Sequence, residues 1–362
     1  MKNTFGNALM MTVFGESHGP SVGVVLDGLA PGIDVNEDEI RAELSLRRPQ
    51  GKISTARVEA DEFVLASGVF NGKATGTPLC IMIPNTNTKS GDYNYGVARP
   101  GHSDLTAYFK YHGFEDYRGG GHFSARLTAP IVAAGALLRS ALKEKGIRIG
   151  THIAKLGGIA DRDFGDLADD LDALHAKYLP TLSDEAGDKM RETIEAVAAD
   201  GDSIGGILET AILGVPAGVG EPFFDSVESE LSHLMFSVPA VKGVEFGAGF
   251  GFADLRGSTA NDPIRAEDGG YTFGMNNNGG INGGITNGAP ILMRLAVKPT
   301  PSIYKTQDSV NFLTHENAEH VGKGRHDPAV IHRARIVVDS LAALGIADLL
   351  TVRYGTDWLA SV

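Results

Sequence analysis

Cysteine is nearly absent from this sequence. Among its 362 residues only Cys80 is a cysteine, so no disulfide can form within the chain, and a reducing cytoplasm fits. Cys80 stands in the apolar run 79–83, which predicts a small buried side chain. A chain of this length can bury a large core without cross-links, so we expect it to fold unaided.

Long apolar runs are missing as well. No stretch approaches the roughly 20 apolar residues that a membrane-spanning helix needs. The first residues, MKNTFGNALMM, lack the sustained apolar region and the small-residue cleavage site of a secretory leader. We therefore expect a soluble, unprocessed protein with no membrane partner.

Positive charge is in deficit overall but concentrated locally. The formal net charge of −13 argues against nonspecific binding of nucleic acids or membrane surfaces, and no metal site is expected. Basic residues gather at 47–57, 99–126 and 323–335, interleaved with glycine or histidine. This pattern suits a small polyanion, although each arginine taken alone is better explained by a solvated face or a neighbouring carboxylate.

Apolar patterning predicts a mixed α and β chain. Strands are predicted at 22–28, 63–68, 79–84, 147–154, 205–213 and 290–297, and helices at 36–46, 124–145, 184–199, 222–236 and 328–344. Asn36 is the expected cap of the first helix and Ser124 that of the second. The second helix is apolar nearly all round from Ala129 to Leu138, which places it in the interior.

We expect one domain over residues 1–362 rather than two. The stretch 155–200 is the most polar and acidic part of the chain and reads as a peripheral insertion. The candidate motifs lie on both sides of it, near residue 18 and near residue 327. They must serve one site if they act together.

The motif GESHG at 15–19 matches the Gly-x-Ser-x-Gly nucleophile elbow of α/β hydrolases, which would make Ser17 a nucleophile. The context opposes that interpretation, because an elbow needs a strand, a sharp turn and a helix, whereas Pro20 and a strand-like segment follow here. The motif does hold the imidazole of His18 between glycines, where it can act as acid or base near neutral pH. His18 can equally be a structural residue beside a strand.

Two further motifs combine histidine or glycine with basic residues. RPGHSD at 99–104 puts His102 just before a helix-like segment. A protonated imidazole there can donate to a departing phosphate oxygen, although a solvated surface turn explains the segment equally well. DYRGGGHFSAR at 116–126 runs three glycines into a capped helix between Arg118 and Arg126, which favours an anion site over an ordinary turn.

Two later motifs are also open to more than one interpretation. NNNGGINGGITNG at 276–288 is too rich in glycine for regular structure and too long for a simple hairpin turn. Its backbone can lie against a planar ring system, or it can be a disordered loop. KGRHDP at 323–328 combines basic groups with the carboxylate of Asp327, which can also serve as a helix N-cap with Pro328 in the first turn.

The motifs taken in order, GESHG, RRP followed by Arg57, RPGH, YRGGGxxSAR, PAVKG, NNxGGIxGGI, KPTPS and GRHDP, closely resemble the chorismate synthase family. The resemblance runs from about residue 6 to about residue 345. It implies an α/β fold of the α+β type, a single-domain β-α-β sandwich with helices packed between antiparallel sheets. It also implies a homotetramer.

The activity implied by the resemblance is that of a carbon–oxygen lyase. It makes chorismate by 1,4-elimination of phosphate from 5-enolpyruvylshikimate 3-phosphate, in the shikimate pathway of aromatic amino acid biosynthesis. The family requires reduced FMN although the reaction is redox-neutral. NADPH is a candidate reductant, used by the chain itself or through a separate flavin reductase, and the sequence leaves both routes open.

The resemblance also assigns roles to individual positions. His102 would protonate the leaving phosphate, His18 would give a proton to or stabilise the reduced flavin, and Asp327 would help to handle the flavin N5 proton. The substrate-binding positions would be Ser17, Arg47, Arg57, Arg99 and Arg126. The cofactor-binding positions would be His122, Phe123, Ser124, Pro239, Ala240, Gly283, Lys298, Pro299, Thr300, Pro301, Ser302 and Arg325.

Some positions depart from the family pattern. Ile53 stands where many relatives carry a basic residue, Asn282 replaces a more usual leucine, and Asp339 falls where glutamate is usual. Two other functions remain as alternatives. One is a noncatalytic flavin- or phosphate-binding protein, against which the intact histidines and aspartate of the motifs count, and the other is a hydrolase with Ser17 as nucleophile.

Overall fold

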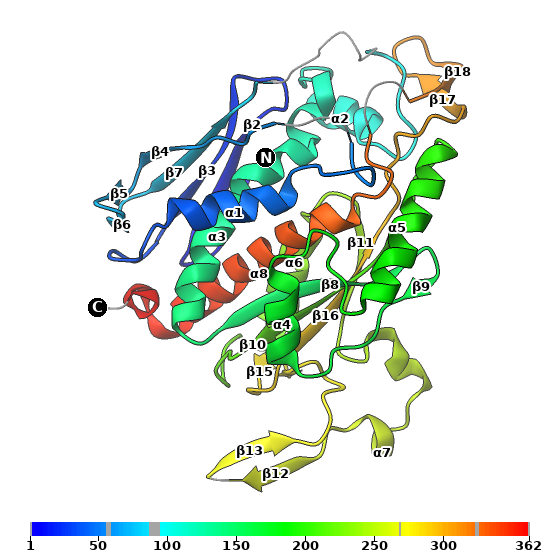
Figure 1. The fold of residues 1–362 in the computed structure, drawn as a ribbon. Helices are drawn as coiled ribbons and strands as arrows, with labels where there is room; N and C mark the ends of the chain where they lie inside the picture. The colour runs from blue at the N-terminus through cyan, green and yellow to red at the C-terminus, as the bar shows by residue number, and fades with distance from the viewer. Residues whose placement is uncertain (1, 56–58, 87–94, 268, 323–325, 361–362) are drawn as a thin grey trace.

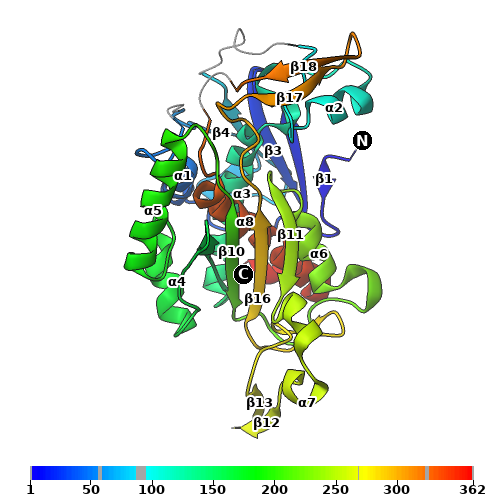
Figure 2. The same cartoon turned by 90° about the vertical axis from the view of Figure 1, so that its right-hand side faces the viewer.

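The structure, a computed structural model, describes residues 2–55, 59–86, 95–267, 269–322 and 326–360. Its architecture is layered, with a five-stranded sheet on each side of a central group of helices (Figure 1, Figure 2). All strand pairs within these two sheets are antiparallel. The predicted sandwich of helices between antiparallel sheets is therefore confirmed.

The two sheets come from different parts of the chain. The first contains, in spatial order, β1 (Thr4–Phe5), β2 (Met10–Gly15), β3 (Ser21–Asp27), β7 (Leu79–Pro84) and β4 (Val64–Ser67). The second contains β11 (Val241–Phe246), β16 (Ile291–Val297), β10 (Gly206–Leu213), β8 (Arg148–Leu156) and β9 (Ile159–Ala160). In β3 the alternate residues Val22, Val24 and Leu26 are fully buried, as expected when one face of a sheet packs on a core.

Two long helices form the middle of the sandwich. They are α3 (Thr128–Glu144), which packs on β3 and β7, and α8 (Ile331–Tyr354), which packs on β8 and β10. α1 (Glu37–Arg47) lies against both of them, and α6 (Val227–Met235) lies against α8 and β11. The central helices therefore connect the two sheets through one continuous apolar core.

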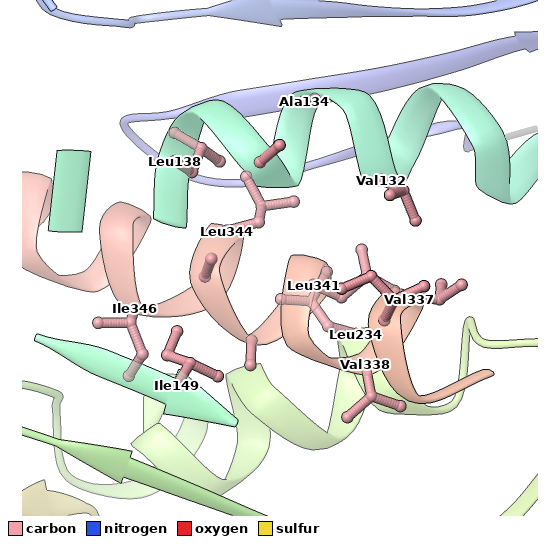
Figure 3. Packing of buried hydrophobic residues seen from close by; sticks show 14 of the residues in the cluster. Val132, Ala134, Leu138, Ile149, Leu234, Val337, Val338, Leu341, Leu344 and Ile346 are labelled. Atoms are coloured by element: carbon pink, nitrogen blue, oxygen red, sulfur yellow. The ribbon is translucent and has the colours of Figure 1, made fainter. Parts of the chain in front are cut away.

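The two long helices approach each other most closely at Gly135. A Cβ at this position would lie 2.2 Å from the Cβ of Ser340, so only glycine permits this separation. Apolar side chains from both helices interdigitate on either side of this point, among them Val132, Leu138, Leu341 and Leu344 (Figure 3). Burying each of these side chains stabilises the fold by about 1.5–3 kcal/mol.

α3 corrects one expectation from the sequence. The segment Ala125–Glu144 is long and apolar enough to cross a membrane by length and composition, although no such segment was expected. In the structure 78% of its apolar window is buried, and α1, α8 and the first sheet cover it. Its composition is that of a core helix with apolar neighbours on all sides.

The remaining elements are short or peripheral. The other helices are α2 (Asp104–Tyr111), α4 (Leu167–His175), α5 (Asp184–Ala199) and α7 (Gly257–Ala260), with 3-10 turns at Arg118–Phe123, Ala125–Leu127, Phe223–Asp225, Gly249–Asp254 and Thr356–Leu359. The two-stranded pairs are β5 (Val69–Phe70) with β6 (Lys73–Ala74), β12 (Ile264–Glu267) with β13 (Gly270–Phe273), β14 (Ile281–Asn282) with β15 (Ile285–Thr286), and β17 (Gln307–Asn311) with β18 (Glu316–His320). The β12–β13 pair projects away from the body of the molecule (Figure 1).

The polar segment 155–200 flanks the second sheet. α4 covers the outer face of that sheet, where Leu171 and Leu174 pack with Ala211 in a small separate cluster. α5 turns Met190 and Ile194 into the main core, and both are fully buried. The segment therefore adds to the core as well as covering it.

The end of the last helix is tied to the beginning of the chain. The buried carboxylate of Asp348 accepts hydrogen bonds from the backbone N–H groups of Asn7, Ala8 and Leu9, at 2.9, 2.8 and 2.8 Å. A carboxylate that accepts several backbone N–H bonds forms a strong, charge-assisted contact. This contact fixes the turn between β1 and β2 onto α8.

The helix starts confirm one predicted cap and revise two others. The side chain of Asn36 accepts from Asp38 N and Glu39 N and caps α1, as predicted. Ser124 caps only the short 3-10 turn that follows it, and α3 begins at Thr128. The alternative interpretation of Asp327 as the cap of the last helix is not observed, because α8 begins at Ile331 and the Asp327 carboxylate binds other groups.

Two other expectations are also revised. Cys80 is only partly buried, because alternate residues of β7 face opposite sides of the first sheet and Cys80 lies on the side away from the helices. The glycine-rich stretch 276–288 is not free of regular structure. It contains the β14–β15 pair, with Gly283 and Gly284 at its turn.

Candidate active site

One large cavity, of about 950 Å³, is lined by residues from both sheets and from the helices between them. Its wall includes His18, His102 and Asp327, the three residues that the motifs suggest for catalysis. Arg99 lines it as well. Residues that lie more than 300 positions apart in the sequence therefore face one space.

A turn of three glycines forms the part of the wall that carries the histidines. Gly119, Gly120 and Gly121 have φ values of 62°, 82° and 53°, in the left-handed region that favours glycine. A Cβ on Gly119 would lie 2.2 Å from His18 Cε1, and a Cβ on Gly120 would lie 3.5 Å from His102 Cε1. The two imidazoles thus pack on neighbouring glycines of the same turn.

His102 is held by a carboxylate. Its Nδ1 lies 2.8 Å from Asp104 Oδ1, and Arg99 binds the same carboxylate with Nε and Nη2, each at 2.7 Å. Burial alone would raise the pKa of Asp104, but the hydrogen bonds from Arg99 and His102 outweigh burial and hold that pKa well below its usual range. The ionised carboxylate can only accept hydrogen bonds, so His102 Nδ1 must be the donor.

Asp327 is fixed from two directions. Its Oδ1 accepts from the backbone N–H of Thr55 at 2.9 Å, and its Oδ2 accepts from Arg333 Nη1 at 2.5 Å. Arg333 also donates from Nε to the carbonyl of Arg47 at 2.7 Å. Asp327 thus joins the segment after α1 to the start of α8.

Arg47 and Arg126 lie behind the cavity wall rather than in it. Both pair with Asp61, Arg47 at 3.5 Å and Arg126 more closely, and Glu59 lies 3.3 Å from Arg126. Arg47 Nε also donates to Thr128 Oγ1 at 2.9 Å, and Thr128 lines the cavity. Burial lowers the pKa of Arg47 to about 10, which leaves the guanidinium charged at neutral pH.

Most of the positions suggested for cofactor binding share one wall. Those that line the cavity are His122, Phe123, Ser124, Pro239, Ala240, Lys298, Thr300, Pro301 and Ser302. The carbonyl of Ala240 accepts from the backbone N–H of Lys298 at 2.9 Å, which joins two of these segments. Lys298 Nζ donates to the carbonyl of Gly101 at 2.6 Å, so this wall is also tied to the segment that carries His102.

Other suggested positions do not line the cavity. Ser17 is fully buried behind the glycine turn, and its backbone N–H donates to the carbonyl of Gly121 at 3.0 Å. Gly283 lies near the end of β16 opposite to Lys298, about 20 Å away at the usual rise of a strand. Pro299 is outside the wall although its neighbours line it. Arg57 and Arg325 lie outside the described residues.

Several supporting residues of the site were not predicted from the sequence. Glu59 and Asp61 hold Arg126 across more than 60 positions, which no local motif reveals, whereas Arg333 binds Asp327 only six positions away. Asp104 could have been predicted, since it belongs to the RPGHSD motif. The apolar part of the wall, contributed by the central helices, comes from Ile131, Leu341 and Leu344.

The wall suits a ligand that has both an apolar ring system and anionic groups. The lining combines apolar side chains with donors such as Lys298 and Ser124. The hydroxyls of Ser17 and Thr300 are buried and have no hydrogen-bond partner among the described residues, so each has bonding capacity left for a ligand. Among those residues no group of three or more His, Cys, Asp or Glu is placed to hold a metal ion.

The surroundings of Ser17 differ from those of a hydrolase nucleophile. β2 ends at Gly15 and β3 begins at Ser21, so the motif joins two antiparallel strands rather than a strand and a helix. Ser17 is also fully buried, whereas an elbow exposes its serine. The hydrolase alternative gains no support from this geometry.

Comparison with known sequences gives a consistent result. The family model described as chorismate synthase matches residues 9–351. A chorismate synthase of Methanosarcina mazei is 46% identical over 349 residues, which cover 96% of this chain and 95% of that protein. Chorismate synthases of Korarchaeum cryptofilum and Pyrococcus abyssi are 44% and 43% identical over similar spans.

Comparison with solved structures agrees. A crystal structure of chorismate synthase superposes with a TM-score of 0.77 at 28% sequence identity, covering 98% of this chain and 95% of the other. Since the family model spans most of the chain and relatives above 40% identity cover nearly all of it, the chain belongs to the chorismate synthase family.

Proposed function

We propose that the cavity is the active site at which 5-enolpyruvylshikimate 3-phosphate loses phosphate to give chorismate, with reduced FMN bound beside it. The chain is a carbon–oxygen lyase of the shikimate pathway that acts on a phosphate-bearing small molecule. One observation carries the assignment to this cavity. His18 and His102 pack on neighbouring glycines of one turn, in a wall that also contains Asp327.

The proposed proton donor to the leaving phosphate is His102. Its Nδ1 is engaged by Asp104, which leaves Nε2 as the nitrogen for a ligand. A protonated imidazole that gives up this proton neutralises charge on the departing phosphate oxygen. His18 occupies the neighbouring position on the glycine turn, where it can hold or donate a second proton near the cofactor.

The cofactor is proposed to rest on the shared wall. Its holding residues would be His122, Phe123, Ser124, Pro239, Ala240, Lys298, Thr300, Pro301 and Ser302. Pro299, beside this wall, and Arg325, outside the described residues, complete the proposed set. When bound, reduced FMN supplies reversible electron donation, which suits a reaction with no net redox change. Asp327, held by Arg333 and Thr55, offers a carboxylate oxygen to hold a proton beside the cofactor.

The substrate anions are proposed to bind at the arginine side of the cavity. Arg99 lines it directly, and Arg47 and Arg126 stand just behind Thr128 and Ala125. Because Asp61 already pairs with the two buried guanidinium groups, direct contact with a substrate carboxylate requires Asp61 to release one of them. Ser17 and Arg57 complete the proposed substrate set.

We also propose an oligomeric state and a cellular location for the chain. Large apolar side chains are exposed near the projecting β12–β13 pair, among them Phe250 and Tyr271 at 84% and 79% exposure. Such exposure favours burial against another protein surface, and we assign it to a cytoplasmic homotetramer. Gly283 would then contact the cofactor only from a neighbouring subunit. Sedimentation that shows a monomer throughout the micromolar range would remove this part of the proposal.

An anaerobic assay tests the function. The purified protein is incubated with 5-enolpyruvylshikimate 3-phosphate and chemically reduced FMN, and chorismate is followed by its absorbance. Chorismate is the expected product, and its absence from folded protein would contradict the proposal. A parallel reaction with oxidised FMN and NADPH shows whether the chain reduces its own flavin or needs a separate reductase.

A further inference from the structure

We infer that Asp104 is a positioning residue for the elimination, which fixes the orientation and tautomer of His102 so that Nε2 carries the transferable proton. Arg99 in turn holds the carboxylate of Asp104. This inference rests on the proposed function, because it builds on the role of His102 as proton donor. It adds Asp104 to that function as the residue that orients the proton donor, His102.

The contacts of Asp104 leave it little freedom. Its two oxygens accept from Arg99 Nε and Nη2, both at 2.7 Å, from the backbone N–H of Arg99 at 3.0 Å, and from His102 Nδ1 at 2.8 Å. A planar guanidinium fork that binds both oxygens fixes the plane of a carboxylate. The direction in which Asp104 meets the imidazole is therefore set by Arg99.

A purely structural role for Asp104 would have a different geometry. Asp104 is the first residue of α2, where an acidic side chain often stabilises the helix N-terminus. Here the carboxylate instead binds two residues that precede it in the sequence, Arg99 and His102, rather than the N–H groups of the helix. The charge of Asp104 is thus directed at the imidazole that lines the cavity.

The tautomer follows from the charge of the carboxylate. An ionised carboxylate offers no proton, so the 2.8 Å contact with Asp104 favours a proton on His102 Nδ1 in every protonation state. The Ser103 hydroxyl lies farther from the same nitrogen, at 3.4 Å, and can accept as well as donate. In the neutral ring the second nitrogen, Nε2, is then an acceptor, and in the imidazolium it is a donor. His102 can therefore gain and lose its Nε2 proton without turning its ring.

The proton-transfer step is one half of the 1,4-elimination. As the carbon–oxygen bond to phosphate breaks, the departing phosphate keeps the bonding electron pair and takes the Nε2 proton, while the electron pair of the ring C–H bond that breaks in the same elimination becomes the new double bond of the product. The imidazolium becomes a neutral imidazole whose Nδ1–H remains on Asp104. The carboxylate stays ionised throughout, as an orienting carboxylate does in other His–Asp pairs.

Imidazole nitrogen NMR tests the inference without any assay of turnover. Protein labelled with ¹⁵N-histidine is studied at a pH at which the rings are neutral, and the His102 signals are identified by their loss in H102Q. We expect the Nδ1–H tautomer in the wild type and a shift toward the Nε2–H tautomer in D104N. His152 provides an internal reference, because its Nδ1 lies 2.9 Å from Asp161 and should not respond.

Kinetics supply the second readout. D104N should lower kcat at least tenfold, while the KM for the phosphate substrate should change less than threefold. The variant removes only the charge of Asp104 and leaves the other charged groups of the substrate pocket in place. The matched control is D170N, which breaks another Arg–Asp pair, that of Asp170 with Arg162, neither of which lines the cavity. D170N should leave kcat within twofold of the wild type.

Several outcomes would overturn the inference. An Nε2–H tautomer of His102 in the wild-type spectrum does so on its own, whether or not the variant folds. An unchanged His102 tautomer in D104N, or a kcat loss no larger than that of D170N, also does so. If the wild type makes no chorismate, the proposed function fails, while the spectra still decide whether Asp104 sets the tautomer of His102.

Discussion

The imidazole of His18 lies directly against the backbone of Gly119: a Cβ at Gly119 would be 2.2 Å from Cε1 and 2.3 Å from Nδ1 of that ring. No L-side chain fits there unless the ring moves. The contact sets the position of His18 in the cavity wall. It also gives the glycine turn a role that a flexible loop could not have.

G119A should therefore displace His18 and lower kcat by at least tenfold. The added methyl group also carries the cost of a positive φ, about 1 kcal/mol. The control is G72A, since Gly72 has a φ of +73° with nothing within 4 Å of its added Cβ. Steady-state rates and thermal unfolding are measured for both variants. Equal kcat values in the two variants would contradict a positioning role for the contact.

The carboxylate of Asp61 supports two buried arginines at once. D61N should lower the free energy of unfolding by about 3–5 kcal/mol, because it leaves the guanidinium groups of Arg47 and Arg126 without their shared charge partner. D34N is the control, since Asp34 and Lys73 are both exposed and such a pair contributes less than about 1 kcal/mol. Urea denaturation of both variants measures the difference, and comparable losses would argue against a special role for Asp61.

His332 makes stability depend on pH. Burial lowers the pKa of His332 to about 4, whereas an unfolded histidine titrates near pH 6.5. As the pH falls from about 6.5 to 4 the unfolded chain binds this proton and the folded chain does not, so stability is lost, by roughly 3 kcal/mol in total. Urea denaturation from pH 7 to 4.5 should show this loss in the wild type and a smaller one in H332Q.

His152 provides a control, because its contribution to stability should change with pH in the direction opposite to that of His332. Burial alone would lower its pKa, but hydrogen bonds with Asp161 and Glu209 outweigh burial and raise it. Its contribution is therefore complete below about pH 6.5 and is lost as the pH rises through the raised value. H152Q should cost more stability at pH 6 than at pH 9. If H152Q and H332Q altered the pH dependence in the same direction, one of the two assignments would be wrong.

The hydroxyl of Tyr178 links the peripheral segment 155–200 to the active site. It accepts from the backbone N–H of Gln50 at 2.8 Å and lies 2.5 Å from Ser54 Oγ, next to the Thr55 N–H that binds Asp327. Y178F should loosen this contact and lower kcat threefold to tenfold. The control is Y354F, because Tyr354 is exposed at the end of α8 and phenylalanine keeps its stacking on Trp358. If Y178F matched Y354F in kcat, the link would have no functional effect.

Local signals in the sequence predicted the elements but not their partners. The Asn36 cap and the apolar sequence of α3 act within one or two turns of helix, so patterns of neighbouring residues reveal them. The pairing of Asp327 with Thr55 spans 272 positions, and no local pattern encodes it. Cys80 shows another limit, because in a wholly apolar strand the composition does not tell which face is buried.

The motifs predicted much of the polar part of the cavity wall because the chemistry is concentrated in short segments. GESHG, RPGHSD and the glycine turn each bring several groups close together through backbone geometry alone. The supporting residues are dispersed, and only the folded chain brings them together. This explains why Asp61 had no sequence signal. Asp104 stood inside a motif and Arg333 in the basic segment 323–335, but their supporting roles were not predicted.

The contact of Asp348 with the backbone of residues 7–9 has a consequence for biosynthesis. β1 and β2 precede α8 in the chain, so the turn between them cannot make its contact with Asp348 until α8 has been synthesised. Contacts of such large sequence separation slow folding. Leu341 and Leu344 of α8 line the same cavity as Asn3 and Phe5. The cavity is therefore completed only after α8 has been synthesised.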